Sequence, residues 1–163
     1  MRASKRFAIS VVIGSVALQL ATVGAAWADG LSAIAGTWQL NVAQSKFAPG
    51  TEIKAQTRVY VVNGDEVKQT TESIDARGNA VHGQWTAHYD GKDYPLKGNP
   101  DANTIAVMQT GDLTAKSTLK KDGKVVQTVE RTLSKDGKTC TFRYQGVNSK
   151  GEKIDNLLVF DRK

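Results

Sequence analysis

Arg131 is the residue of this sequence whose type and expected position could carry the most specific chemistry. It shares its alternation with Val125 and Val129 in the segment 124–133, which predicts that its side chain points into a protein interior. A buried guanidinium needs an anion or hydrogen-bond acceptors. A bound ligand carboxylate would meet this need, as would an internal partner, whereas a slipped register at Glu130 would turn Arg131 outward.

The other residues expected to face inward are mostly apolar or mildly polar. If the charged faces of the strands point to water, the segment 55–63 turns Thr57, Val59 and Val61 inward. Such a lining suits an elongated amphipathic or apolar molecule, with its tail on the apolar side chains and an acidic head near Arg131. Trp85 and Tyr144 could equally be ordinary core residues. The predicted ligand-binding residues are Arg131, Tyr144, Phe142, Gln127, Gln69, Leu158 and Phe160.

Catalysis is not expected from this sequence. It contains no nucleophile elbow, phosphate loop or pair of acids with catalytic spacing. His82 and His88 lie on the polar side of one predicted strand, where solvated histidines are the ordinary case. Cys140 is the single cysteine and lies on the same face as Phe142, which predicts a buried, inert thiol without an internal disulfide. No metal site and no cofactor are predicted.

Glycine-containing turns divide the chain after residue 50 into short segments. Gly64, Gly78, Gly91, Gly123 and Gly137 follow polar residues and mostly recur about every 13 residues, the length of one strand and one turn. The intervening segments alternate with a period of two, and helix is expected only in the signal and within 41–50. The predicted strands are 36–41, 55–63, 65–74, 80–89, 92–97, 103–109, 112–121, 124–133, 138–145 and 153–161.

This pattern predicts an all-β, single-domain, antiparallel up-and-down meander of about ten strands. An open meander of that length would leave two exposed edges, so closure into a barrel is the simplest arrangement. A flattened, twisted sheet or a two-layer sandwich is the alternative. A barrel of ten strands is wider than the eight-stranded barrels whose interior side chains can fill, so closure also implies internal space.

The stretch AGTWQLNVAQSKF places Gly36 and Trp38 at the head of the first predicted strand. Together with the meander, this resembles the calycin superfamily of lipocalins and fatty-acid-binding proteins. The resemblance implies that Trp38 closes one end of the barrel and that a basic residue of the last strand, here Arg162, packs over it. Phrases such as DGKDYPLKGNPDANT also resemble a group of uncharacterised exported bacterial proteins, which implies no activity.

The sequence departs from the fatty-acid-binding branch at two places. The Arg-x-Tyr pair that grips the ligand carboxylate in that branch is replaced by Leu158 and Phe160. The helical lid between the first two strands is also missing, because only about a dozen residues separate them. The resemblance therefore implies the barrel, with weak affinity for simple fatty acids.

The first 28 residues have the pattern of a cleavable signal peptide. A cationic start precedes the apolar run 7–23 and the cleavage pattern Ala26-Trp27-Ala28, so the predicted domains are a signal peptide, 1–28, and a β-barrel, 29–163. An uncleaved membrane anchor is the alternative. Cleavage removes Arg2, Lys5 and Arg6 and lowers the formal net charge from +6 to +3.

These observations predict a periplasmic or secreted calycin-like protein that binds a small apolar or amphipathic ligand. The cations of the mature chain are interleaved with acids and form no basic stripe, so nucleic-acid binding is not expected. After cleavage no stable membrane anchor is expected. The alternative is a non-enzymatic envelope-interaction or protease-inhibitor-like barrel without a ligand, whose contacts would come from the segments 42–54 or 94–103.

Overall fold

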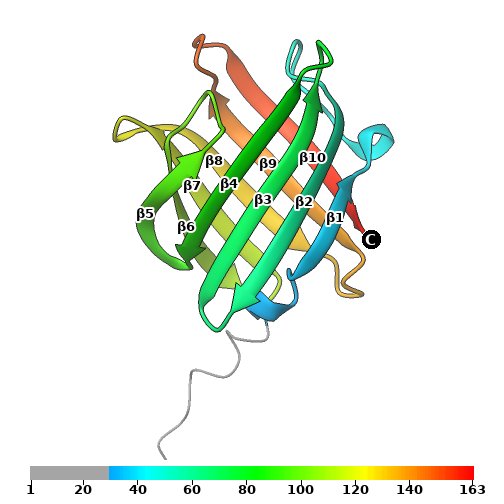
Figure 1. The fold of residues 1–163 in the computed structure, drawn as a ribbon, viewed down its shortest axis with the longest axis vertical. Coiled ribbons are helices and arrows are strands. Elements are labelled where there is room, and N and C mark those ends of the chain that lie inside the picture. The colour runs from blue at the N-terminus through cyan, green and yellow to red at the C-terminus, as the bar shows by residue number, and fades with distance from the viewer. Residues whose placement is uncertain (1–29) are drawn as a thin grey trace, which may run out of the picture.

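The computed structural model describes residues 30–163, which form one closed antiparallel barrel (Figure 1). Within these residues each strand pairs with the next along the chain, and β1 pairs with β10 to close the sheet. The predicted all-β meander of about ten strands and its closure are confirmed. The strands are β1 (Gly36–Leu40), β2 (Ile53–Asn63), β3 (Glu66–Asp75), β4 (Ala80–His88), β5 (Asp90–Lys97), β6 (Thr104–Gly111), β7 (Thr114–Lys121), β8 (Lys124–Leu133), β9 (Thr139–Val147) and β10 (Lys153–Arg162).

The hairpin turns follow from local residue chemistry. At the β7–β8 turn, Asp122 and Gly123 have φ angles of 51° and 79°. Positive φ at both central residues gives a turn whose twist matches that of the flanking strands, and Asp-Gly adopts it readily. The next residues re-enter the ladder directly, with Lys121 paired to Lys124. Sequence-local turns of this kind explain why the strand boundaries were predictable.

The inward face of β2 differs from the sequence-based expectation. Gln56, Arg58 and Tyr60 are buried, whereas Val59 and Val61 are 36% and 48% exposed. The expectation assumed that charged residues face water, but pairing of Trp38 with both Arg58 and Arg162 fixes the register when the barrel closes. A one-residue change of parity moves every side chain of a strand to the other face. The prediction that Thr57, Val59 and Val61 point inward was wrong.

A bulge at the start of β8 changes a second expectation. Leu119 pairs with Gln127 while the next residue, Lys120, pairs with Val125, so one residue of β8 has no direct partner. A bulge of this kind resets the alternation on its strand. Val125 is therefore 59% exposed instead of facing inward, while Val129 and Arg131 keep their predicted inward direction.

The two ends of the barrel are built differently. The segment before β1 lies at the bottom of Figure 1, at what we call the closed end. Leu31 and Ile34 of this segment and Trp38 of β1 are buried. Among residues 30–163, helix is limited to 30–32, just before β1, and to the short 3-10 helix η1 (Val42–Gln44) within the predicted region 41–50. The other end carries the β3–β4 and β9–β10 hairpin loops at the top of the figure. The predicted signal peptide lies outside the described residues.

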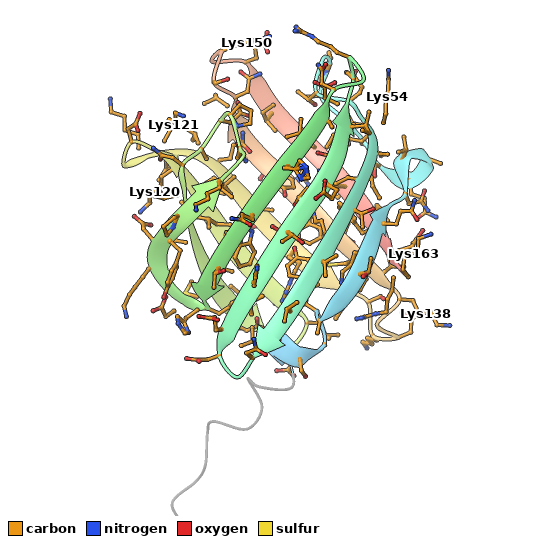
Figure 2. All side chains as sticks on the ribbon, in the orientation of Figure 1. Lys54, Lys120, Lys121, Lys138, Lys150 and Lys163 are labelled. Atoms are coloured by element: carbon orange, nitrogen blue, oxygen red, sulfur yellow. The ribbon has the colours of Figure 1, made fainter. Side chains whose placement is uncertain are left out.

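Charged side chains are concentrated on the outside of the barrel. Figure 2 shows the labelled lysines, among them Lys54, Lys121 and Lys150, projecting from its periphery. The ion pairs of the described part of the chain also lie there, for example Lys120 with Asp93 at 2.8 Å. Across residues 30–163, none of the helical stretches has the length and apolar character needed to cross a bilayer.

Candidate ligand-binding cavity

The barrel contains a cavity of about 620 Å³ that reaches the surface between four loops. These loops, at 50–53, 75–77, 97–101 and 148–150, form what we call the mouth. The volume falls within the range of about 300–1,000 Å³ that is usual for small-molecule sites. The buried apolar residues that line it are Tyr60, Trp85, Ile105, Leu119, Val129, Phe142, Ile154 and Leu158.

Arg58 of β2 is the buried charged residue that lines this cavity. Its guanidinium carbon lies 4.5 Å from the ring centroid of Phe142 and 4.4 Å from that of Phe160. These two rings meet edge to face, with centroids 5.5 Å apart. They form an aromatic base on which the guanidinium lies, an arrangement that is favourable for a cation over a π face.

The polar contacts of Arg58 fix its direction. Nε donates to Oε1 of Gln56 at 3.0 Å, and Nη2 donates to the hydroxyl of Tyr144 at 2.9 Å. Burial disfavours the charged form, but the Tyr144 and Tyr60 hydroxyls favour it, and the pKa of Arg58 lies above its ordinary value. Arg58 therefore carries a positive charge inside the barrel under all working conditions.

The barrel interior holds cations without matching acids. The buried polar residues within 30–163 are four glutamines, one asparagine and two arginines, with no aspartate or glutamate among them. No carboxylate of the described residues lies within salt-bridge distance of Arg58 or Arg131. The acids that line the cavity, Glu52, Asp75 and Asp101, belong to the mouth.

Five of the seven predicted ligand-binding residues line the cavity, namely Tyr144, Phe142, Gln127, Gln69 and Leu158. Gln127 Nε2 donates to the backbone oxygen of Val147 at 3.1 Å, and Gln69 Nε2 donates to Thr71 Oγ1. Phe160 is fully buried beneath Arg58 and does not line the space. Arg58 was missed because the parity of β2 was inverted, and the Arg58–Tyr60 alternation was the signal that could have revealed it.

Arg131 is also buried, yet it does not line the cavity. Its Nη1 lies 3.3 Å from the Tyr89 hydroxyl and its Nη2 lies 3.5 Å from Gln109 Oε1. Nε has no hydrogen-bond partner among the described residues. The sequence correctly turned this side chain inward. Contact with a ligand head group stays a prediction, and the place of Arg131 outside the cavity wall gives it no support.

The closed end explains the Gly-x-Trp pattern. Trp38 is fully buried, its Nε1 donates to the Ile34 oxygen at 2.8 Å, and the Arg162 guanidinium lies 4.2 Å from its ring centroid. Gly36 has a φ of 120°, and a Cβ added there would lie 2.9 Å from Arg162 Nη1. Glycine is needed at this position because of both the backbone conformation and the space that Arg162 occupies.

Hydrogen bonds from Arg162 fasten the segment before β1 to the barrel. Its Nε donates to the Gly137 oxygen at 2.7 Å and its Nη1 to the Ala35 oxygen at 2.6 Å.

Cys140 of β9 is fully buried. Burial raises the pKa of its thiol to about 11, although Arg131, Arg58 and Arg162 act in the opposite direction. The thiol is therefore protonated and shielded, as expected from its strand position.

Hydrogen bonds at the mouth end join loops to β10 and to one another. The Asn156 Oδ1 accepts from the Ala48 backbone N–H at 2.6 Å and holds the β1–β2 connection against β10. The Asp101 Oδ1 accepts from the Ser149 backbone N–H at 2.8 Å, so the β5–β6 loop contacts the β9–β10 loop. These contacts fix the positions of the loops, and the cavity still reaches the surface between them.

The histidines take no part in the cavity. His82 pairs with Glu72 at 2.7 Å, and His88 lies 3.2 Å from Asp65, both on the outer face of the sheet. Within residues 30–163 no group of three or more His, Cys, Asp or Glu side chains could hold a metal ion.

Comparison with known proteins gives matches to solved structures only. No family model and no curated protein matches the chain. A redesigned β-barrel, mFAP1, bound to DFHBI, is 12% identical, with a TM-score of 0.47 over 82% of this chain and 99% of that one. Rv2717c from M. tuberculosis is 15% identical, with a TM-score of 0.47 over 82% and 94%. The siderocalin Ex-FABP is 13% identical, with a TM-score of 0.38 over 80% and 74%.

The fold can be identified from the chain itself. Its strands follow one another around a closed up-and-down barrel, and the first-strand Trp38 is covered by the last-strand Arg162. Both features are those implied by the resemblance at the start of β1. The protein therefore has a calycin-like barrel fold.

Proposed function

We propose that this protein is an exported binding protein that holds a small amphipathic or apolar molecule in its barrel cavity. The observation that carries this proposal is the cavity of about 620 Å³ inside the barrel. Its wall combines aromatic and aliphatic side chains with a few fixed polar groups, the usual composition of a small-molecule site. The open mouth provides a route of entry.

The alternative, an interaction protein without a ligand, would be favoured by a filled barrel and by protruding loops. The interior is not filled. Asn156 of β10 holds the segment 42–54 through the Ala48 N–H, and Asp101 of the segment 94–103 accepts from the Ser149 N–H of the β9–β10 loop. The open cavity therefore favours a binding protein over an interaction protein without a ligand. Binding in it requires no catalytic group.

The test is binding of Nile red, a neutral apolar dye, to the mature protein, combined with native mass spectrometry of protein purified from its own cells. Ser117 lines the cavity, and its neighbour Thr118 points to the opposite face of β7. Ser117→Phe should fill the space and weaken dye binding at least tenfold, whereas Thr118→Phe should leave it within twofold of wild type. Equal dye binding by both variants, or no dye binding at all, would contradict the proposal.

Export is part of the proposal and rests on the sequence of residues 1–28. The mature N-terminus should be Asp29, one residue before the described Gly30. N-terminal sequencing of the protein recovered from the cell envelope checks this. Recovery of chains that begin at Met1 would contradict it.

A further inference from the structure

The cavity wall contains a buried positive charge that no carboxylate of the described residues neutralises. Arg58 is only 7% exposed and lines the cavity, and no carboxylate within residues 30–163 pairs with it. A buried charge without a partner is costly, and a bound anion would remove that cost. This space therefore favours a negatively charged group.

The hydrogen-bond donors around Arg58 indicate the kind of anion. The guanidinium has five N–H groups, and the hydrogen bonds to Gln56 and Tyr144 use Nε and one N–H of Nη2. The Tyr144 oxygen accepts from Arg58, so its own O–H remains a donor. The Gln56 Oε1 also accepts from Arg58, so its NH₂ group remains available. These groups from β2 and β9 all line the cavity.

The shape and polarity of the wall indicate what carries the anion. The same space is lined by buried apolar side chains, namely Phe142, Val129, Leu119, Leu158 and Trp85. An apolar body of the ligand would lie against these side chains. A multiply charged group such as a free phosphate would find a single cation there, whereas a carboxylate matches one guanidinium in both charge and geometry.

We propose that Arg58, Tyr144 and Gln56 form an acid-binding site, and that the ligand is an amphipathic carboxylic acid that enters acid-first and keeps its apolar body in the cavity. This inference rests on the proposed function, because it specifies the ligand of the same cavity. It also separates the two buried arginines. Arg58 contacts the ligand, while Arg131 stays outside the cavity wall.

The test compares 1-pyrenebutanoic acid with its methyl ester as competitors that displace Nile red. The two molecules differ mainly in the acidic charge. The wild-type protein should bind the acid at least tenfold more tightly than the ester. Arg58→Met, which keeps a long side chain over Phe142 and Phe160, should abolish this preference by weakening the acid alone. Tyr144→Phe should weaken the acid several-fold and leave the ester within twofold.

Arg131→Met is the matched control, because it removes a second buried guanidinium from the same barrel, and it should leave the preference unchanged. Nile red binding by each variant shows that the cavity is intact. Equal affinity of the wild type for acid and ester, or loss of acid preference in Arg131→Met, would overturn the acid site while the proposed function stands. Failure of Nile red, the acid and the ester to bind the wild type would overturn both.

Discussion

Arg58 of β2 and Arg131 of β8 place the same chemical group at two points inside one barrel, with different surroundings. Arg58 rests on two aromatic faces, has hydrogen bonds of 3.0 and 2.9 Å, and borders the cavity. Arg131 has contacts of 3.3 and 3.5 Å, an unpaired Nε, and no place in the cavity wall. The comparison shows that an inward arginine is a candidate ligand group only where the fold leaves space beside it.

The same contrast holds for the two ends of the molecule. The closed end is fixed by packing and by carbonyl acceptors around Arg162, so changes there should act on stability. The mouth end is open, so changes there should act on binding. Four predictions test the part of this division that concerns stability.

Trp38→Ala should have the largest effect. Trp38 is fully buried, and the Arg162 guanidinium covers its ring. Truncating a buried large aromatic costs about 3–5 kcal/mol of unfolding free energy. Urea denaturation measures this cost. A loss below about 1 kcal/mol would show that the closed end does not depend on this contact.

Alkaline pH should lower the free energy of unfolding, because Cys140 is a buried thiol. Burial raises the pKa of the thiol from its ordinary value near 9 to about 11, so the unfolded chain loses this proton first as the pH rises. The stabilisation is complete below pH 9 and is lost as the pH rises through 11, by roughly 2–3 kcal/mol. Urea denaturation at several pH values measures it, with Cys140→Ala as the control that should lack this part. Parallel pH profiles for the two proteins would contradict the prediction.

Gly36→Ala should destabilise the protein by about 1–3 kcal/mol, because alanine is strained at a φ of 120° and its Cβ would crowd Arg162. Gly91→Ala is the matched control, with a φ of 76° and no atom within 4 Å of the added Cβ. Thermal unfolding compares the two variants. If Gly91→Ala costs as much as Gly36→Ala, the Arg162 contact contributes nothing beyond backbone strain.

Arg131→Met should have the smallest effect, a gain of about 1 kcal/mol in unfolding free energy. Replacing a buried, poorly paired charge by an apolar side chain of similar length is often neutral or stabilising. Urea denaturation measures the change. A loss of more than about 2 kcal/mol would show that the Tyr89 and Gln109 contacts make Arg131 a structural requirement.

Local patterns in the sequence determined most of the fold. Asp122-Gly123 and the other glycine turns fixed where strands begin and end, because positive φ is a property of single residues. Period-two alternation placed Gln69, Gln127 and Phe142 on the inner face, and their burial agrees with it. The Gly36-x-Trp38 pattern indicated the calycin-like closure through its resemblance to that superfamily.

Only the tertiary structure decided the site. The alternation of β2 is compatible with either face inward, and the choice depends on the pairing of Trp38 with both Arg58 and Arg162, residues far apart in the sequence. The bulge that exposes Val125 likewise depends on the partner strand β7. Whether an inward arginine meets empty space depends on side chains from several strands at once. Burial and cavities are properties of the assembled barrel, so a pattern along one strand could turn Arg131 inward but could not show that Arg58 is the arginine beside the cavity.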